Sequence, residues 1–104
     1  MGVFEVRVEG NAHVRVSGEL DMRTAPQLVS AVESLAGTEV QRVVVDLSRV
    51  TFMDSSGTSA LLLAKAKLDV DGTVLVLRDV STQVDAVLRM CGLDGEFVRD
   101  ADGT

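Results

Sequence analysis

Two short apolar runs, separated by a segment of helix length, constrain the fold of this chain more than any other feature. Residues 43–45 and 74–77 contain only valine and leucine, which is typical of strands in a sheet with parallel pairs. Parallel strands need a long crossover connection, and residues 56–68 between the two runs are rich in alanine and leucine. We therefore expect two central strands that are covered on both faces and joined by a mostly buried helix.

Alternating apolar and polar residues before this unit predict two further strands. Residues 3–8 and 12–17 each place apolar side chains on one face and polar side chains on the other. Gly10 and Asn11 lie between these segments, and both residue types tolerate the positive φ of a tight turn. The sequence therefore predicts an N-terminal hairpin.

Capping and terminating residues predict one helix on each side of the two apolar runs. Residues 24–27 have the form of a capping box with a proline in the first turn, and apolar residues continue at helical spacing to Ala36, just before Gly37. After the second run, Ser81 is the expected N-cap of a third helix that Gly92 ends.

The end of the chain predicts a short last strand at residues 96–98 and a frayed tail at residues 100–104. The expected order is therefore β-β-α-β-α-β-α-β. This is an α/β fold with a mixed sheet and crossover helices packed on it. A length of 104 residues supports one compact domain, which we expect to span residues 1–104.

The charge of the chain narrows its partners. Ten basic and sixteen acidic side chains leave a net charge of −6, which argues against nucleic acid or an anionic membrane surface as the partner. The uncharged run at residues 55–64 is too short to span a bilayer, and the N-terminus lacks the basic and apolar regions of a secretory signal. The single cysteine, Cys91, cannot form an internal disulfide. We expect a cytoplasmic protein whose partners are proteins.

Motifs of common enzymes are absent. A hydrolase elbow around Ser55 would need glycine where Met53 stands, and there is no phosphate-binding loop of the Gly-Lys-Ser/Thr type. We expect the only histidine, His13, to be solvated on a polar strand face, and Cys91 to be buried on the apolar stripe of the third helix. The sequence therefore predicts no metal site, no cofactor and no catalytic residue, and a hydrolase that uses Ser55 would lack a base.

The most unusual segment is residues 50–59, which pass from a buried strand directly into a helix. It lies at the carboxyl end of a central strand, where open α/β sheets place their sites, and the free N–H groups of a helix start favour an anion. The alternative is structural, because Asp54, Ser55 or Ser56 could simply cap the helix.

Three short motifs make the sequence similar to a known family. They are VVDLS at residues 44–48, FMDSSG at residues 52–57 and GELD at residues 18–21. Together they resemble the bacterial anti-sigma factor antagonists, which consist of a STAS domain. The resemblance spans essentially the whole chain, and the expected element order is the order of that family.

The resemblance implies that an anti-sigma factor, itself a serine kinase, phosphorylates Ser55. In that family the unphosphorylated antagonist binds the kinase and releases a sigma factor, phosphorylation blocks the binding, and a PP2C-type phosphatase restores it. The antagonist is thus a substrate and not an enzyme. The partner-binding residues that the resemblance implies are Asp21, Asp54, Ser56, Gly57 and Thr58.

The chain departs from the family after Gly57, where Thr58 and Ser59 replace the usual small apolar residues. We expect this difference to affect the choice of partner. The chain resembles a free-standing STAS domain and not a module of a longer protein. The alternative function is a STAS binding module with a different partner, such as the small cytoplasmic subunit of a lipid-transport ATPase, which would not need a serine at position 55.

Overall fold

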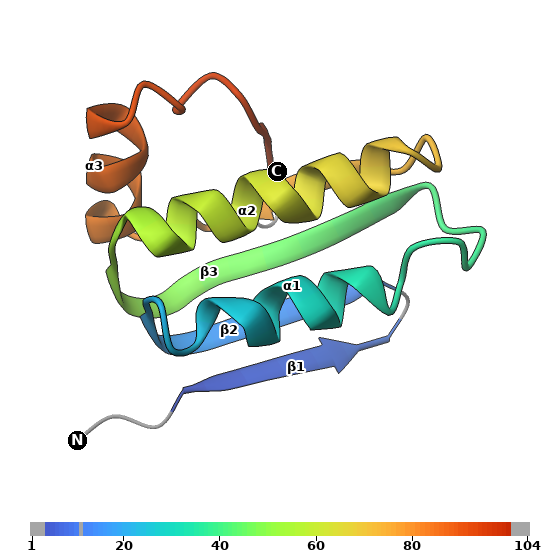
Figure 1. Ribbon diagram of the computed structural model, residues 1–104, viewed down its shortest axis with the longest axis horizontal. Helices are drawn as coiled ribbons and strands as arrows, with labels where there is room; N and C mark the ends of the chain where they lie inside the picture. The colour runs from blue at the N-terminus through green and yellow to red at the C-terminus, as the bar shows by residue number, and fades with distance from the viewer. Residues whose placement is uncertain (1–3, 11, 101–104) are drawn as a thin grey trace.

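The structure, a computed structural model, describes residues 4–10 and 12–100. Along these residues the elements are β1 (Glu5–Glu9), β2 (His13–Leu20), α1 (Ala25–Glu33), β3 (Arg42–Met53), α2 (Ser55–Asp69), β4 (Val74–Arg78), α3 (Thr82–Met90) and β5 (Val98–Asp100) (Figure 1). The predicted order β-β-α-β-α-β-α-β is confirmed, and so is the α/β class.

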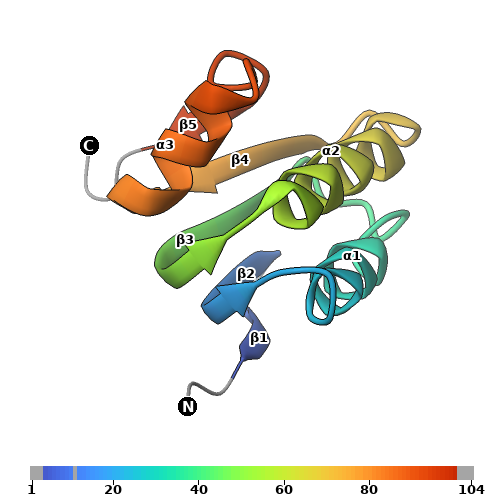
Figure 2. The same ribbon diagram turned by 60° about the vertical axis from the view of Figure 1, so that its left-hand side comes forward.

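The strands form one mixed sheet in the order β1-β2-β3-β4-β5. β1 is antiparallel to β2, whereas β2, β3, β4 and β5 pair in parallel. Every parallel connection steps in the same direction across the sheet, and because such connections are right-handed, they place their helices on the same face. Figures 1 and 2 show α1 and α2 side by side on that face. Helix α3 contacts the same face, because its Asp85 forms an ion pair with Arg99 at 2.8 Å. Arg99 is the register partner of Leu77, which is buried on the face that the helices cover.

The helices lie on one face of the sheet, so the expectation that the central strands are covered on both faces is wrong for β3, whereas Val76 of β4 is buried on the other face as well. Val43 and Val45 are buried beneath the helices, whereas Val44 between them is only partly buried. The face away from the helices, called the open face here, carries a row of charged residues in register across the sheet. That row is Arg7, Arg15, Asp46, Arg78 and Asp100. Ion pairs between neighbouring strands, such as Arg78 to Asp100 at 2.7 Å, link this row.

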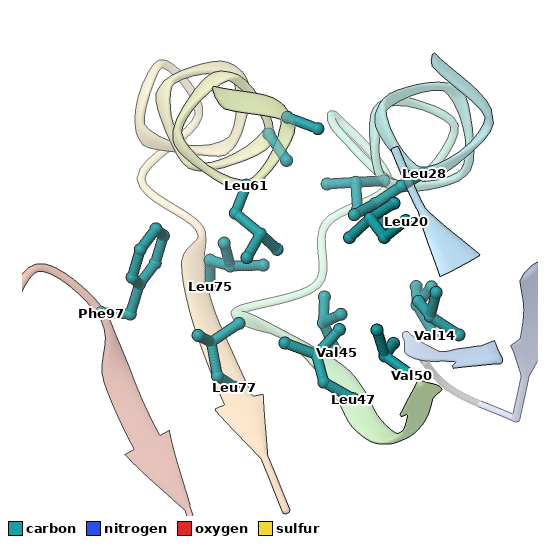
Figure 3. Packing of buried hydrophobic residues seen from close by; sticks show 14 of the residues in the cluster. Val14, Leu20, Leu28, Val45, Leu47, Val50, Leu61, Leu75, Leu77 and Phe97 are labelled. Carbon is teal, nitrogen blue, oxygen red and sulfur yellow. The ribbon is translucent and has the colours of Figure 1, made fainter. Parts of the chain in front are cut away.

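The core lies between the sheet and the helices (Figure 3). Valines of β2 and β3 pack against leucines of α1 and α2, and residues of β4 continue the cluster toward Phe97. The fully buried side chains include Val14, Leu20, Leu28, Val45, Leu47, Leu61, Leu68, Leu77 and Leu88. Burial of large apolar side chains at about 25 cal/mol per Å² supplies the main driving force for this arrangement.

The first helix differs from the sequence prediction at both ends. It stops at Glu33 and continues as turns to Gly37, whose φ of +77° ends the segment. Thr24 occupies the N-cap position, but its side chain makes no capping bond. Its hydroxyl instead donates to the Glu19 carbonyl at 2.7 Å and accepts the Asp21 amide at 3.0 Å. Thr24 therefore stabilises the turn after β2 and not the helix start.

The third helix is capped as predicted but ends earlier. Ser81 accepts a hydrogen bond from the Val84 amide at 3.4 Å, and Gly92 has a φ of +71°. Cys91 is exposed, because α3 ends at Met90 and Cys91 forms its C-cap. The expectation that Cys91 is buried is therefore wrong.

The last strand is Val98–Asp100 and not residues 96–98. Asp100 pairs with Arg78 in this strand, so it does not belong to the frayed tail that was expected. Residues 101–104 and Asn11 of the predicted hairpin turn lie outside the described residues. Within the described part of the chain, no helix is both long and apolar enough to cross a bilayer.

Candidate functional site

The candidate site lies at the edge of the sheet where two parallel strands end together. Leu20 at the end of β2 is the register partner of Met53 at the end of β3. The next residues, Asp21 and Asp54, therefore emerge at the same edge. The Asp54 amide donates to the Leu20 carbonyl at 3.4 Å, which ties the start of α2 to the end of β2.

Asp54 is the N-cap of α2. One carboxylate oxygen, Oδ1, accepts hydrogen bonds from the amides of Ser56 at 2.9 Å and Gly57 at 3.4 Å. The structural interpretation is thus correct for Asp54. It also argues against the expected anion site at this helix start, because the Asp54 carboxylate already binds amides that an anion would need.

Ser55 is the first residue of α2, and its side chain is exposed. Ser56 is partly buried. Thr58 is only 4% exposed, and its hydroxyl donates to the Ser55 carbonyl at 2.7 Å. This bond satisfies the buried hydroxyl within the first turn of the helix. Of these three hydroxyl residues, Ser55 is therefore the most accessible.

Gly57 is buried where α2 approaches the end of β2. A Cβ at this position would lie 3.0 Å from the Leu20 carbonyl oxygen and would overlap the Met53 side chain. Gly57 and Thr58 are thus internal to the site, and they shape it without presenting a surface of their own.

Asp21 lies on the β2–α1 turn and is held by Arg23. The Arg23 amide and guanidinium each donate to the Asp21 carboxylate at 2.9 Å. The hydrogen bond from the guanidinium is the main reason that the pKa of Asp21 lies below its usual range. Asp21 is therefore a fixed negative charge at this edge of the sheet.

A groove between α1 and α2 extends the site, and sequence reasoning missed it. Its volume is about 570 Å³. Ser55 and Ser56 line one end, and the far end includes Lys67 and Glu33, which form an ion pair at 2.8 Å. Its apolar lining consists of Met22, Ala25, Pro26, Val29, Ala60 and Leu63. The available signal was the run of leucines at residues 61–63, which is too long for one buried face of a helix.

Met22 and Leu63 are large apolar residues of this groove that remain exposed, at 76% and 49% of their maximal exposure. Large apolar side chains that remain exposed around a concave surface are typical of a protein contact site. The groove and the exposed Ser55 hydroxyl together form the candidate site.

The site holds no catalytic constellation. His13 begins β2, at the end of the strand remote from Ser55, and lies on the open face in register with Val44. Among the residues that the structure describes, no three His, Cys, Asp or Glu side chains gather as metal ligands.

Comparisons with known proteins agree with this architecture. A family model described as "Mlab, STAS domain" matches residues 4–99. An anti-sigma F factor antagonist from Paenibacillus polymyxa is 32% identical over 81 residues, which are 77% of this chain and 69% of that protein. The chain belongs to the STAS-domain family of anti-sigma factor antagonists. An anti-sigma-B factor antagonist from Staphylococcus aureus is 28% identical over 80 residues, 77% of the chain and 74% of that protein.

Solved structures confirm the STAS fold. An anti-sigma factor antagonist from Mycobacterium paratuberculosis is 31% identical with a TM-score of 0.71, covering 93% of this chain and 83% of its own. The unphosphorylated form of the antagonist SpoIIAA is 22% identical with a TM-score of 0.74, covering 96% of this STAS domain and 90% of its own chain. Anti-sigma factor antagonists are regulatory proteins and not enzymes, so membership of this family confirms the expectation that the chain is not an enzyme.

Proposed function

We propose that this STAS domain is an anti-sigma factor antagonist controlled by phosphorylation of Ser55. In its unphosphorylated form it binds an anti-sigma factor that is a serine kinase, and a sigma factor is released. A PP2C-type phosphatase reverses the modification, and the exchange takes place in the cytoplasm. The observation that carries the proposal is the exposed Ser55 hydroxyl at the start of α2, at one end of the apolar groove.

Ser55 is a better acceptor than its neighbours. Thr58 is buried and donates its hydroxyl to a backbone carbonyl, and Ser56 is partly buried. Ser59 is exposed, but it lies in the groove one turn further along α2, where the rigid helix limits access to a kinase active site. A chain end or helix start can enter such a site more readily than a helix interior.

The chemistry assigned to Ser55 is phosphoryl transfer from ATP. The Ser55 oxygen forms a bond to the γ-phosphorus, the bond from that phosphorus to the β–γ bridging oxygen breaks, and ADP leaves. A base of the kinase takes the hydroxyl proton. Asp54 is less suited to that role, since its Oδ1 is bound by the helix amides.

The phosphate would block binding through its charge. It adds about −1.5 to −2 charges at pH 7, beside Asp54 and at the edge that also carries Asp21. The amides of Ser56 and Gly57 already bind the Asp54 carboxylate, so they cannot fully neutralise the new charge. Burying it in an interface would cost several kcal/mol, enough for a loss of about a hundredfold in affinity.

In the first experiment, each anti-sigma factor serine kinase of the source organism is purified and incubated with the domain and ATP, and peptides are mapped by mass spectrometry. We expect phosphate on Ser55 in the wild type and in the matched control Ser56→Ala, and none in Ser55→Ala. Phosphate on Ser56 alone would show that the residue is wrongly assigned.

The second experiment measures binding to the same kinases in the presence of ADP. Wild type and Ser55→Ala should bind, and Ser55→Asp should bind about a hundredfold more weakly. Asp21→Ala should reduce the magnitude of the free energy of binding by more than it lowers the free energy of unfolding, since the Asp21 carboxylate is bound by Arg23 at the surface.

A second candidate function is a STAS binding module with a different partner. This alternative is supported by the description of the matching family model, which names Mlab beside the STAS domain. Such a module would bind its partner equally well as Ser55→Ala and Ser55→Asp. Absence of phosphorylation by every kinase tested, together with that indifference to charge, would favour this alternative.

A further inference from the structure

The pairing between β2 and β3 changes register twice on the way to the candidate site. Val14 lies opposite Val45, Gly18 opposite Val50, and Leu20 opposite Met53. β3 therefore uses eight steps where β2 uses six, and it contains two extra residues. Each irregularity is a β-bulge, which bends a strand and re-aims its side chains.

Asp46 holds the first bulge. The register is regular up to the pair of Arg15 with Asp46 and resumes at Ser17 with Arg49, so Leu47 and Ser48 share one position. The Ser48 amide donates to Asp46 Oδ1 at 2.9 Å. The carboxylate thus binds an amide in the irregular part of the ladder, and Asp46 is only 9% exposed. Because this bond gives a partner to an amide in the irregular part of the ladder, it stabilises the bulge.

Gly18 accompanies the second irregularity, which follows its pair with Val50. Its φ of +97° lies in a region that side chains with a Cβ avoid. The two irregularities therefore have separate local supports, and both lie upstream of the residues that form the site.

The bulges decide which residues meet at the end of the strands. If the register of Val14 and Val45 continued unchanged, Leu20 would lie opposite Thr51 and not opposite Met53. The Asp54 amide would then no longer reach the Leu20 carbonyl, and Gly57 would lose its place against it. Loss of the first bulge alone would shift the register by one residue, and the side chains that follow would then exchange faces of the sheet.

We propose that Asp46 is a positioning residue for the site at Ser55. Its carboxylate holds the bulge at Leu47 and Ser48, and the bulge sets the register that brings the start of α2 against the end of β2. Asp46 lies nine positions before Ser55 and acts only through the strand between them. The phosphorylation readout of this inference rests on the proposed function, whereas its structural readout does not.

The ion pair between Asp46 and Arg15, at 4.0 Å, offers a competing explanation for any effect of a substitution. An asparagine at position 46 keeps an oxygen that accepts the Ser48 amide but removes the charge. Arg15→Gln removes the ion pair and leaves the bulge intact. Asp46→Ala removes both, so the three variants separate the hydrogen bond from the charge.

The structural arm of the test follows backbone amides by NMR and hydrogen exchange, with no kinase present. In Asp46→Ala we expect altered shifts and faster exchange at Ser48, Asp54 and Gly57. Asp46→Asn and Arg15→Gln should resemble the wild type at these amides. Unchanged amides at Asp54 and Gly57 in Asp46→Ala would overturn the proposal, and an Asp46→Asn variant like Asp46→Ala would show that the charge matters instead.

The functional arm measures the rate of Ser55 phosphorylation at a saturating concentration of the domain, which is the kinase's substrate, at a temperature where each variant is folded. Asp46→Ala should lower kcat by about tenfold, as misplacement of a reacting group does, and Asp46→Asn should stay within about twofold of wild type. Phe97→Leu, a core change at the opposite edge of the sheet, serves as the control for lost stability. An equal loss in this control would overturn a positioning role. If the wild type is not phosphorylated, the proposed function fails, and the amide arm alone decides the role of Asp46.

Discussion

Gly57 packs against the carbonyl oxygen of Leu20, so closely that a Cβ on Gly57 would lie 3.0 Å from it. This contact joins the first turn of α2 to the end of β2. It holds the start of α2, where Ser55 lies, and the Asp21 turn at one edge of the sheet, and the effect of substitutions at this contact can be measured directly.

Gly57→Ala should destabilise the fold by about 1–3 kcal/mol, because the new methyl group meets the Leu20 carbonyl and the Met53 side chain. Urea denaturation measures the loss. The matched control is Gly95→Ala, where an added Cβ meets nothing within 4 Å, and it should stay within about 0.5 kcal/mol of wild type. Equal stability of the two variants would contradict the close approach.

Asp54→Ala should lower stability by about 1 kcal/mol, since the Ser56 and Gly57 amides lose their cap. Asp54→Asn should recover most of this loss, because the amide oxygen can accept the same bonds. Thermal and urea unfolding of both variants check the expectation. Full stability of Asp54→Ala would mean that water or Ser55 caps the helix equally well.

The Asp100–Arg78 pair should make stability depend on pH. The hydrogen bond from Arg78 holds the pKa of Asp100 below its ordinary value of 3.8, with a smaller contribution from the charge of Arg42. A depressed native pKa stabilises the fold above the ordinary value, and this stabilisation is lost as the pH falls through the native pKa. Wild type should therefore exceed Asp100→Asn in urea midpoint at pH 7, and the difference should shrink toward pH 3. A difference independent of pH would exclude this linkage.

Met22→Ala should weaken binding to the kinase by about tenfold and leave stability unchanged, because Met22 is 76% exposed in the groove. Titration calorimetry gives the affinity. Met90→Ala is the matched control, since Met90 is 86% exposed on α3 outside the groove. Equal affinity of the two variants would place the interface elsewhere.

Phosphorylation of Ser55 should leave the fold intact and act at the interface. Amide shifts should change mainly at residues 54–60 and at their neighbours near Asp21, with little change in melting temperature. This follows because Ser55 is exposed and its side chain is outside the core. Widespread shifts across the sheet would indicate a conformational switch instead.

The element order and the core could be predicted from the sequence because apolar periodicity reports burial directly. The covering of only one sheet face by helices could not be predicted, because Val43, Val44 and Val45 look alike in a sequence, while only the direction of the crossovers decides which face the helices cover. Thr24 shows a similar limit, since its hydroxyl bonds to the Glu19 carbonyl, a partner that helix-start rules do not consider. Cys91 was misplaced because α3 ends one residue earlier than the periodicity suggested.

The residues of the candidate site could be predicted from the resemblance to a family. The geometry around them could not, because it depends on contacts between segments that are distant in the sequence. One sequence signal for the bulges was present. The buried apolar residues of β3 are Val43, Val45, Leu47, Val50 and Met53, whose spacing changes from two to three where the register shifts. A regular strand would have kept the spacing of two.

The two bulges also constrain the number of residues between Asp46 and Asp54. Insertion or deletion of one residue there would turn every later side chain of β3 to the other face, exposing Val50 and Met53 and burying Thr51. The exposed turns at residues 37–39 and 70–72 lie outside the strands and carry no such constraint. Over evolutionary time, length changes should therefore accumulate in those turns, while the spacing from Asp46 to Asp54 stays constant even as the residues within it change.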